Sequence, residues 1–249
     1  MSVLEVRGLT KRFGSLVAVR DISLTVAPGE LRAVIGPNGA GKTTFFNLVS
    51  GFFAPSAGSI LFDGRDITGV PAHQRVGLGM ARTFQVTEVF PELTVFENIR
   101  IVAEVAAGYR LRPWLNRAEA AELRRRIEAT LEFSALSAKA DRVVGELAHG
   151  DQRAAEIAMT LALKPHLLLL DEPTAGMGDQ ETYEITQLIR RLHKVGKLTI
   201  VLIEHDMRVV FHLADRITVL DQGRFLAEGT PQEIAASPAV QTAYLGQAA

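Results

Sequence analysis

The 249-residue sequence contains no cysteine, which excludes a disulfide framework, a zinc-finger site and a thiol nucleophile. It has no uninterrupted apolar stretch of about 18 residues, the minimum for a membrane-spanning helix. Its first residues lack the apolar core of a signal peptide. With a net charge of −1 and no long basic run, it is a poor candidate for binding duplex nucleic acid. We therefore expect a cytosolic chain that reaches a membrane only through a partner.

The distribution of apolar residues predicts a parallel α/β core interrupted by a helical insertion. Apolar residues make up 47% of the chain, enough for the core of one large domain. Alternation predicts half-exposed strands at 3–9 and 22–26, with Ile22, Leu24 and Val26 on one face. Continuous apolar runs predict strands covered on both faces, at 31–35, 167–170 and 198–203. Shorter strands are predicted at 59–62, 217–220 and 224–227, the last two as a hairpin, and a capping box with proline at the first helical position at 230–233.

The middle of the chain, from about 94 to 163, has a helical pattern. Within 117–133, one apolar stripe consists of Ala120, Leu123, Ile127 and Leu131, and charged residues occupy the other faces. Glu122 and Arg126 are spaced to pair across one turn of this helix.

The most informative segment is the phosphate-binding loop Gly36-Pro37-Asn38-Gly39-Ala40-Gly41-Lys42-Thr43. It follows the predicted strand 31–35 and opens a predicted helix that begins with Thr43 and Thr44. Glycines let successive backbone N–H groups approach phosphate oxygens, and the helix N-terminus is positive. In such loops the lysine reaches the β- and γ-phosphates and the Thr43 hydroxyl binds Mg²⁺.

Two carboxylates complete the predicted magnesium-nucleotide site. The apolar strand 167–170 ends in Asp171 and Glu172. We expect Asp171 to hold Mg²⁺, directly or through water, and Glu172 to polarise the attacking water. The two motifs together predict a nucleoside triphosphatase.

These motifs, with the segments between and around them, resemble the ATP-binding cassette (ABC) family over nearly the whole chain. The resemblance implies a glutamine that reports on Mg²⁺ and the attacking water, at Gln85, and a histidine that contacts the γ-phosphate, at His205. It implies an aromatic that stacks on adenine, at Phe13, for which a place in the core is the alternative. It also implies a signature segment, Leu147-Ala148-His149-Gly150-Asp151, that touches ATP held by a second subunit, and an interface loop at 175–179.

The resemblance implies the fold class and the site as a whole. The fold is a P-loop NTPase (RecA-like) core with an N-terminal antiparallel β subdomain and an inserted helical subdomain. One domain spans 1–249, with its core at 1–87 and 163–235, the helical subdomain at 88–162 and a C-terminal helix or tail at 236–249. The catalytic residues expected are Glu172, His205, Gln85 and Lys42. The ATP-binding residues expected are Phe13, Gly36, Pro37, Asn38, Gly39, Ala40, Gly41, Lys42, Thr43, Thr44, Ala148, His149 and Gly150. The Mg²⁺ ligands expected are Thr43, Gln85 and Asp171.

The resemblance also implies partners. These are integral membrane permease subunits, a second ATP-binding subunit (this chain or a paralogue) in a head-to-tail dimer, and indirectly a solute-binding protein. The chain then lies peripherally on the cytoplasmic face of the inner or plasma membrane. We expect Val89 and Phe90 to line the groove that receives a permease helix, with plain core packing as the alternative.

The signature segment departs from the family pattern. Ala148 stands where a serine is usual, which removes one hydroxyl donor to the γ-phosphate. Asp151 replaces the usual glutamine, and its local role is expected to be capping the helix that follows. Gly178 stands where many relatives carry aspartate. These departures bear on dimer strength and hydrolysis rate rather than on nucleotide binding.

Several segments are similar to ATP-binding subunits of branched-chain amino acid importers, including 41–47, 81–85, 172–177 and the tail 227–246. Urea and short-chain amide importers carry similar segments. The remaining candidate classes are a lipid exporter motor, a non-transporting ABC ATPase of the DNA-repair, ribosome-associated or assembly kind, and a small-molecule kinase. No coiled coil, tandem domain or basic extension favours the non-transporting class.

Overall fold

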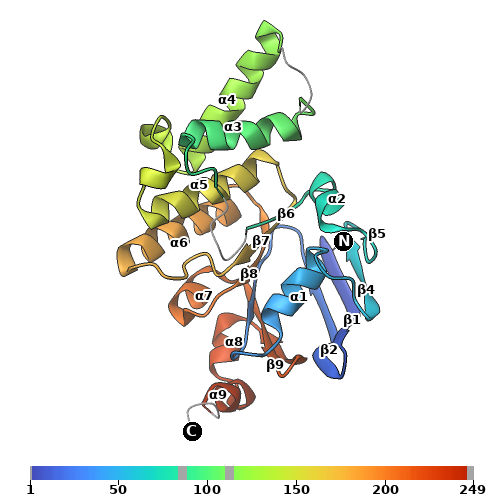
Figure 1. Cartoon of the computed structure of the whole chain (residues 1–249). Coiled ribbons are helices and arrows are strands. Elements are labelled where there is room, and N and C mark those ends of the chain that lie inside the picture. The colour runs from blue at the N-terminus through green and yellow to red at the C-terminus, as the bar shows by residue number, and fades with distance from the viewer. Residues whose placement is uncertain (1, 84–88, 110–114, 246–249) are drawn as a thin grey trace. The chain divides into compact units, whose positions relative to one another are not determined.

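The computed structural model describes residues 2–83, 89–109 and 115–245 (Figure 1). The chain divides into two compact units. The first contains Met1–Arg82, His166–Glu172 and Ile189–Ala249, and the second contains Thr83–Pro165 and Pro173–Leu188. The predicted helical subdomain, 88–162, falls within the second unit, which also takes in Pro173–Leu188.

The first unit holds a mostly parallel sheet in the order β10-β9-β3-β8-β7-β6. Its strands are β3 (Leu31–Ile35), β6 (Met80–Arg82), β7 (Leu167–Asp171), β8 (Thr199–Ile203), β9 (Arg216–Asp221) and β10 (Arg224–Gly229). Every residue of β3, β7 and β8 is buried, as predicted from their continuous apolar runs. Because parallel strands end at one edge, the loops after β3, β7 and β8 lie together there. Only β10 runs antiparallel, as the predicted hairpin with β9.

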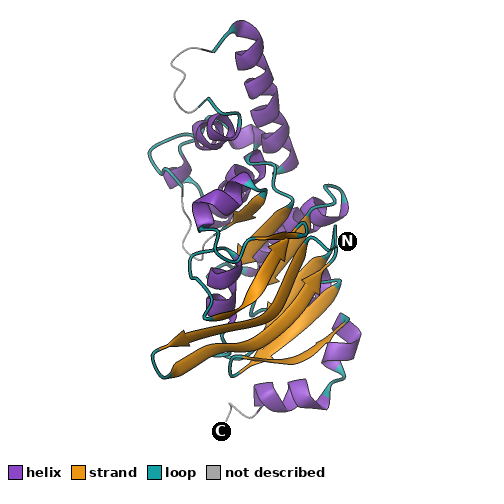
Figure 2. Ribbon diagram, turned by 90° about the vertical axis from the view of Figure 1, so that its right-hand side faces the viewer, coloured by secondary structure: helices purple, strands orange, loops and turns teal. Residues whose placement is uncertain are grey.

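An antiparallel sheet in the order β2-β1-β4-β5 belongs to the same unit (Figure 2). It contains β1 (Leu4–Phe13), β2 (Leu16–Val26), β4 (Ala57–Phe62) and β5 (Arg65–Asp66). The predicted face of Ile22, Leu24 and Val26 is buried. These side chains join one core with Phe45 and Phe46 of α1 (Lys42–Val49) and with residues of the parallel sheet. The predicted N-terminal β subdomain is therefore confirmed.

The remaining helices of the first unit are α2 (Ala72–Gly77), α7 (Met207–Leu213), α8 (Pro231–Ala235) and α9 (Pro238–Leu245). The capping box predicted before α8 is present, since Thr230 accepts from the Glu233 N–H and Glu233 accepts from the Thr230 N–H. The long helix α6 (Asp179–Lys194) belongs to the second unit up to Leu188 and to the first unit beyond it.

The second unit is helical, with α3 (Val95–Ala106), α4 (Arg117–Phe133) and α5 (His149–Ala162) packed on one another. Two short 3₁₀ turns, Ser137–Lys139 and Val144–Glu146, lead into α5. Helix α4 has the predicted bounds, and Leu123, Ile127 and Leu131 are buried. Two details were wrong: Ala120 is exposed, and Glu122 pairs with Arg125 at 2.5 Å rather than with Arg126. Among the described residues, no helix combines the length and apolar character needed to cross a bilayer.

Candidate functional site

The loop between β3 and α1 is shaped by two close backbone approaches. Gly36 has φ of 153°, and a Cβ there would lie 2.1 Å from the carbonyl oxygen of Leu220. Gly41, with φ of 95°, precedes the first helical residue of α1, and a Cβ there would lie 2.5 Å from the Ala18 oxygen. No larger residue fits either position without moving backbone, so the glycines are required for this loop conformation.

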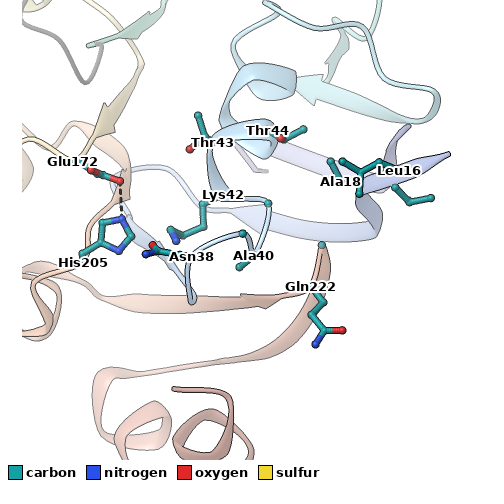
Figure 3. A pocket seen from close by; sticks show the side chains of 14 residues that line it. Leu16, Ala18, Asn38, Ala40, Lys42, Thr43, Thr44, Glu172, His205 and Gln222 are labelled. Atoms are coloured by element: carbon teal, nitrogen blue, oxygen red, sulfur yellow. Dashed lines mark hydrogen bonds and ion pairs between the residues drawn. The ribbon is translucent and has the colours of Figure 1, made fainter. Parts of the chain in front are cut away.

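The loop opens into a cavity of about 500 Å³, within the size range of small-ligand sites. The loop and the start of α1 line it with residues 38–44, and β2 adds residues 16–18. Glu172, His205 and the 222–223 turn complete the lining (Figure 3). The predicted residues Asn38, Gly39, Ala40, Gly41, Lys42, Thr43 and Thr44 all line this cavity.

Lys42 contributes a positively charged ammonium group to the cavity lining. Its side chain folds over the loop and donates to the carbonyl oxygens of Gly36 at 2.7 Å and Pro37 at 3.0 Å. Burial lowers the pKa of Lys42, and the charges of Glu172 and Asp171 act in the opposite direction. The two carboxylates at the end of β7 therefore favour the charged form of this lysine.

Glu172 follows β7 with φ of 46°, a left-handed conformation that is rare for a residue with a side chain. Its N–H donates to the Ile203 oxygen at 2.9 Å, which ties the strained residue to the end of β8. Its Oε1 lies 2.6 Å from His205 Nε2, the contact drawn in Figure 3. The His205 N–H in turn donates to Glu204 Oε2. A strained, hydrogen-bonded carboxylate in a cavity is typical of an active-site group.

Asp171 is the last residue of β7 and is buried, with an ion pair to Arg82. It is not among the residues that line the cavity, whereas its neighbour Glu172 is. Within the described ranges, no three or more histidine, cysteine, aspartate or glutamate side chains are grouped so that they could hold a metal ion together. A hydroxyl from Thr43 and a carboxylate from Asp171 suit Mg²⁺, which is usually held by one or two protein oxygens together with nucleotide phosphates.

Like Asp171, the predicted residues Gly36, Pro37 and Phe13 do not line this cavity, and Gln85 cannot be placed. Phe13 pairs with Leu16 across the β1–β2 hairpin, and Leu16 lines the cavity while Phe13 does not. The Phe13 ring stands edge-on to Phe53, with centroids 5.5 Å apart, and the Lys11 ammonium lies 5.1 Å from its centroid. Gln85 lies outside the described residues.

The segment 147–151, the predicted signature segment, lies at the start of α5 in the second unit. Ala148 is the N-cap residue and makes no side-chain cap bond, and the helix begins at His149. The Gly150 N–H donates instead to Glu181 Oε1 at 3.0 Å. Hydrogen bonds from the N–H groups of Gly150 and Gly178 lower the pKa of Glu181. A carboxylate from α6 therefore supplies the acceptor that a capping side chain would have given.

The prediction that Asp151 caps this helix was wrong. Asp151 lies in the first turn of α5, and its carboxylate binds Lys139 at 2.5 Å. The chain turns helical before Asp151, because Glu181 already satisfies the N–H of Gly150.

Sequence reasoning missed several residues around the site. They are Leu16, Val17, Ala18, Gln222 and Gly223 in the lining and Arg82 beside Asp171; in the second unit, Glu181 beside Gly150 was missed as well. Each acts across a long sequence separation, so no local pattern marks it. Only the Asp221-Gln222-Gly223 turn carried a signal, as the predicted hairpin turn after 217–220.

Comparison with known proteins places these features in context. A family model described as "ABC transporter" matches residues 19–175, and one described as "Branched-chain amino acid ATP-binding cassette transporter" matches residues 226–249. The chain is 42% identical to LivG, the high-affinity branched-chain amino acid transport ATP-binding protein of Escherichia coli K12, over 99% of this chain and 98% of that protein. The corresponding Pseudomonas aeruginosa protein, BraF, gives the same values.

One further sequence relative and two solved structures are more distant from this chain. The sulfate/thiosulfate import ATP-binding protein CysA of Methylococcus capsulatus is 38% identical over 95% of this chain and 65% of its own length. The ADP conformation of an ATP-binding cassette of an ABC transporter superimposes with a TM-score of 0.85 and 29% identity, covering 99% of both chains. A nucleotide-free cassette gives a TM-score of 0.84 and 28% identity over 98% of this chain and 99% of the other.

Proposed function

Because this chain belongs to the ABC transporter family, whose ATP-binding proteins are ATPases, we propose that it is the ATP-hydrolysing subunit of a membrane importer of branched-chain amino acids. The observation that carries the solute class is the family match of the C-terminal segment, residues 226–249, together with 42% identity over nearly the full length of LivG and BraF. The observation that carries the chemistry is the cavity that joins the phosphate loop to Glu172 and His205.

ATP binds with its phosphates in the loop. The N–H groups of residues 38–44 and the Lys42 ammonium surround the β- and γ-phosphates. Thr43 and Asp171, with the predicted Gln85, would hold Mg²⁺, which would neutralise charge on the phosphates. The adenine lies towards the β1–β2 hairpin, where Leu16 and Ala18 line the cavity and Phe13 is the predicted stacking partner.

Hydrolysis transfers the γ-phosphoryl group to water. Glu172 accepts a proton from the attacking water while the oxygen of that water bonds to the γ-phosphorus. The bond between the γ-phosphorus and the β–γ bridging oxygen breaks, which gives ADP and phosphate. His205, 2.6 Å from Glu172 Oε1, holds the carboxylate in place and lies within the same cavity as the γ-phosphate.

A second ATP-binding subunit completes the site. Ala148, His149 and Gly150 of that subunit face the γ-phosphate, and the Gly150 N–H donates to it. Within the isolated chain this N–H binds the Glu181 carboxylate. When the dimer closes on ATP, the Gly150 N–H therefore exchanges the Glu181 carboxylate for the γ-phosphate as its acceptor. Hydrolysis removes the γ-phosphate, and with it the contact that favours the closed dimer over the open one.

The membrane partner is a permease, and a solute-binding protein acts through it. The chain lies on the cytoplasmic face of the membrane by binding this permease. Phe90 is 46% exposed and Val89 is half-buried, which suits residues that line a docking groove better than residues of a closed core. Val89→Asp and Phe90→Asp are each expected to weaken assembly, whereas Val105→Asp, at an exposed residue of α3, is the matched control. Wild-type assembly and coupling in both groove variants would contradict this role.

The function is tested by purifying the chain from solubilised membranes. We expect a multispanning membrane protein and a second ATP-binding subunit, either this chain or a paralogue, to purify with it. In proteoliposomes, a binding protein loaded with leucine, isoleucine or valine should raise the rate of ATP hydrolysis. Purification without any membrane protein would contradict the transporter assignment. Stimulation only by urea, a short-chain amide or a lipid would contradict the solute class alone.

A further inference from the structure

Arg82 and Asp171 form a buried ion pair at the ends of two neighbouring strands. β6 and β7 are parallel, with Arg82 opposite Leu169, so the arginine side chain reaches the carboxylate two residues further along β7. Nη2 of Arg82 lies 2.8 Å from Oδ2 of Asp171. The two side chains are only 7% and 6% exposed, so bulk water screens this contact little.

The same guanidinium is also fixed by helix α1, which follows the phosphate loop. Nη1 donates to Asn47 Oδ1 at 2.7 Å and to Ser50 Oγ at 2.8 Å, at the end of that helix. The guanidinium carbon lies 5.7 Å from the Phe46 ring centroid and 5.5 Å from that of Phe52. A planar group with rigidly directed N–H bonds can meet all of these partners at once, and an ammonium cannot.

This geometry has a consequence for the metal site. An ion pair through one oxygen restricts the rotation of a carboxylate, and with it the directions of the lone pairs that remain for a metal. Asp171 is thereby held by a cation that is itself anchored to α1, and α1 carries Thr43, the other expected Mg²⁺ ligand. We propose that Arg82 is a positioning residue that orients Asp171 towards the magnesium ion of Mg·ATP. This inference rests on the proposed Mg·ATP site.

A simple charge effect has the opposite sign, which makes the proposal testable. A guanidinium near a divalent cation repels it, so an Arg82 that acted only through its charge would weaken metal binding. Its removal would then tighten binding. If orientation dominates, its removal loosens binding, as expected for a residue that supports a metal ligand.

The experiment measures the affinity of the purified chain for a fluorescent ATP analogue, with EDTA and with Mn²⁺ as the probe metal. The ratio of the two affinities is the metal enhancement. We expect Arg82→Met to retain wild-type affinity in EDTA and to lose about tenfold of the enhancement, the lower end of the effect of such supporting residues. Arg82→Lys keeps the positive charge but not the planar guanidinium with its directed N–H groups, so the metal enhancement of this variant should fall between those of wild type and Arg82→Met. Arg124→Met removes an exposed ion pair with Glu128 and should change neither affinity.

A double variant separates action through Asp171 from a general effect. Arg82→Met added to Asp171→Asn should lower the enhancement no further than Asp171→Asn alone. Unchanged or tighter Mn²⁺-dependent binding in Arg82→Met, full wild-type enhancement in Arg82→Lys, or additive losses in the double variant would each overturn the proposal. If Arg82→Met does not fold, Arg82→Lys carries the test. Wild-type protein without any metal enhancement would instead refute the Mg·ATP site itself.

Discussion

Arg75 holds the end of the phosphate-loop helix, and its replacement gives the sharpest stability prediction. Its side chain is only 1% exposed, and every hydrogen-bond acceptor described for it is a backbone carbonyl rather than a carboxylate. Two of the acceptors, Leu48 and Val49, are the last residues of α1, whose final carbonyls have no partner within the helix. The others belong to the chain that leads into α2, and are Ile67, Thr68 and Val70.

The size of the effect follows from these contacts. The bonds to Val49, Ile67 and Val70 are the shortest, at 2.6, 2.7 and 2.7 Å. The Ile67 oxygen also accepts from the Val70 N–H, so with about 1 kcal/mol for each of the other two acceptors left unsatisfied, Arg75→Met should lower the free energy of unfolding by about 2 kcal/mol. Burial lowers the pKa of Arg75 to about 10, so the side chain still carries its charge at neutral pH. Arg75→Lys, with three donors on a single nitrogen, should lose less than Arg75→Met.

Urea denaturation of the purified chain, followed by circular dichroism, measures this loss. The midpoint should fall for Arg75→Met without a change in slope. Arg124→Met is the matched control, because Arg124 is exposed and pairs only at the surface with Glu128, so its effect should stay within about 0.5 kcal/mol. A loss below about 1 kcal/mol in Arg75→Met would refute the view that these carbonyls depend on the guanidinium.

Three further outcomes follow from the site and its supports. Glu172→Gln should bind ATP, hydrolyse it about 100-fold more slowly and accumulate as a closed dimer, and normal turnover would remove Glu172 from its role as the base. Gly36→Ala should lose nucleotide binding, measured by titration, because its methyl group would overlap the Leu220 carbonyl; wild-type affinity would contradict that. Burial opposes ionisation of Asp215, but the Leu31 N–H, Lys194 and His193 outweigh it and set the pKa of that carboxyl below its ordinary value. The stability that Asp215 provides is therefore present above about pH 4 and lost as pH falls further, so the urea midpoints of wild type and Asp215→Asn should converge in acid; a pH-independent gap would contradict this.

Local pattern was sufficient where one segment decides the outcome. The strand 31–35, the helix 117–133 and the Thr230 capping box were predicted with their observed positions. In each case the signal is short-range: continuous apolar residues, apolar residues at helical spacing, or a pair of capping side chains three residues apart. The phosphate loop was also predicted from one segment, because the spacing of its glycines indicates the conformation of the same stretch of backbone.

Contacts between segments that are far apart in the sequence could not be predicted from local patterns. Asp151 looked like a cap because the sequence does not reveal that Glu181 reaches Gly150 from another helix. Arg82 and Arg75 look like ordinary charged residues in the sequence, and only the fold surrounds each with buried acceptors. The left-handed backbone of Glu172 has no signal in the sequence, and the bond from its N–H to β8 joins segments that are far apart in the chain.

The central claim is that the loop after β3 holds Mg·ATP, and equilibrium binding tests it most directly. The purified chain, titrated with ATP and Mg²⁺ in a calorimeter, should take up one nucleotide per chain at saturation. Lys42→Ala removes the ammonium from the cavity wall and should abolish most of that affinity while the circular dichroism spectrum stays unchanged. Absence of binding by the wild-type chain, or equal binding by Lys42→Ala, would contradict the account.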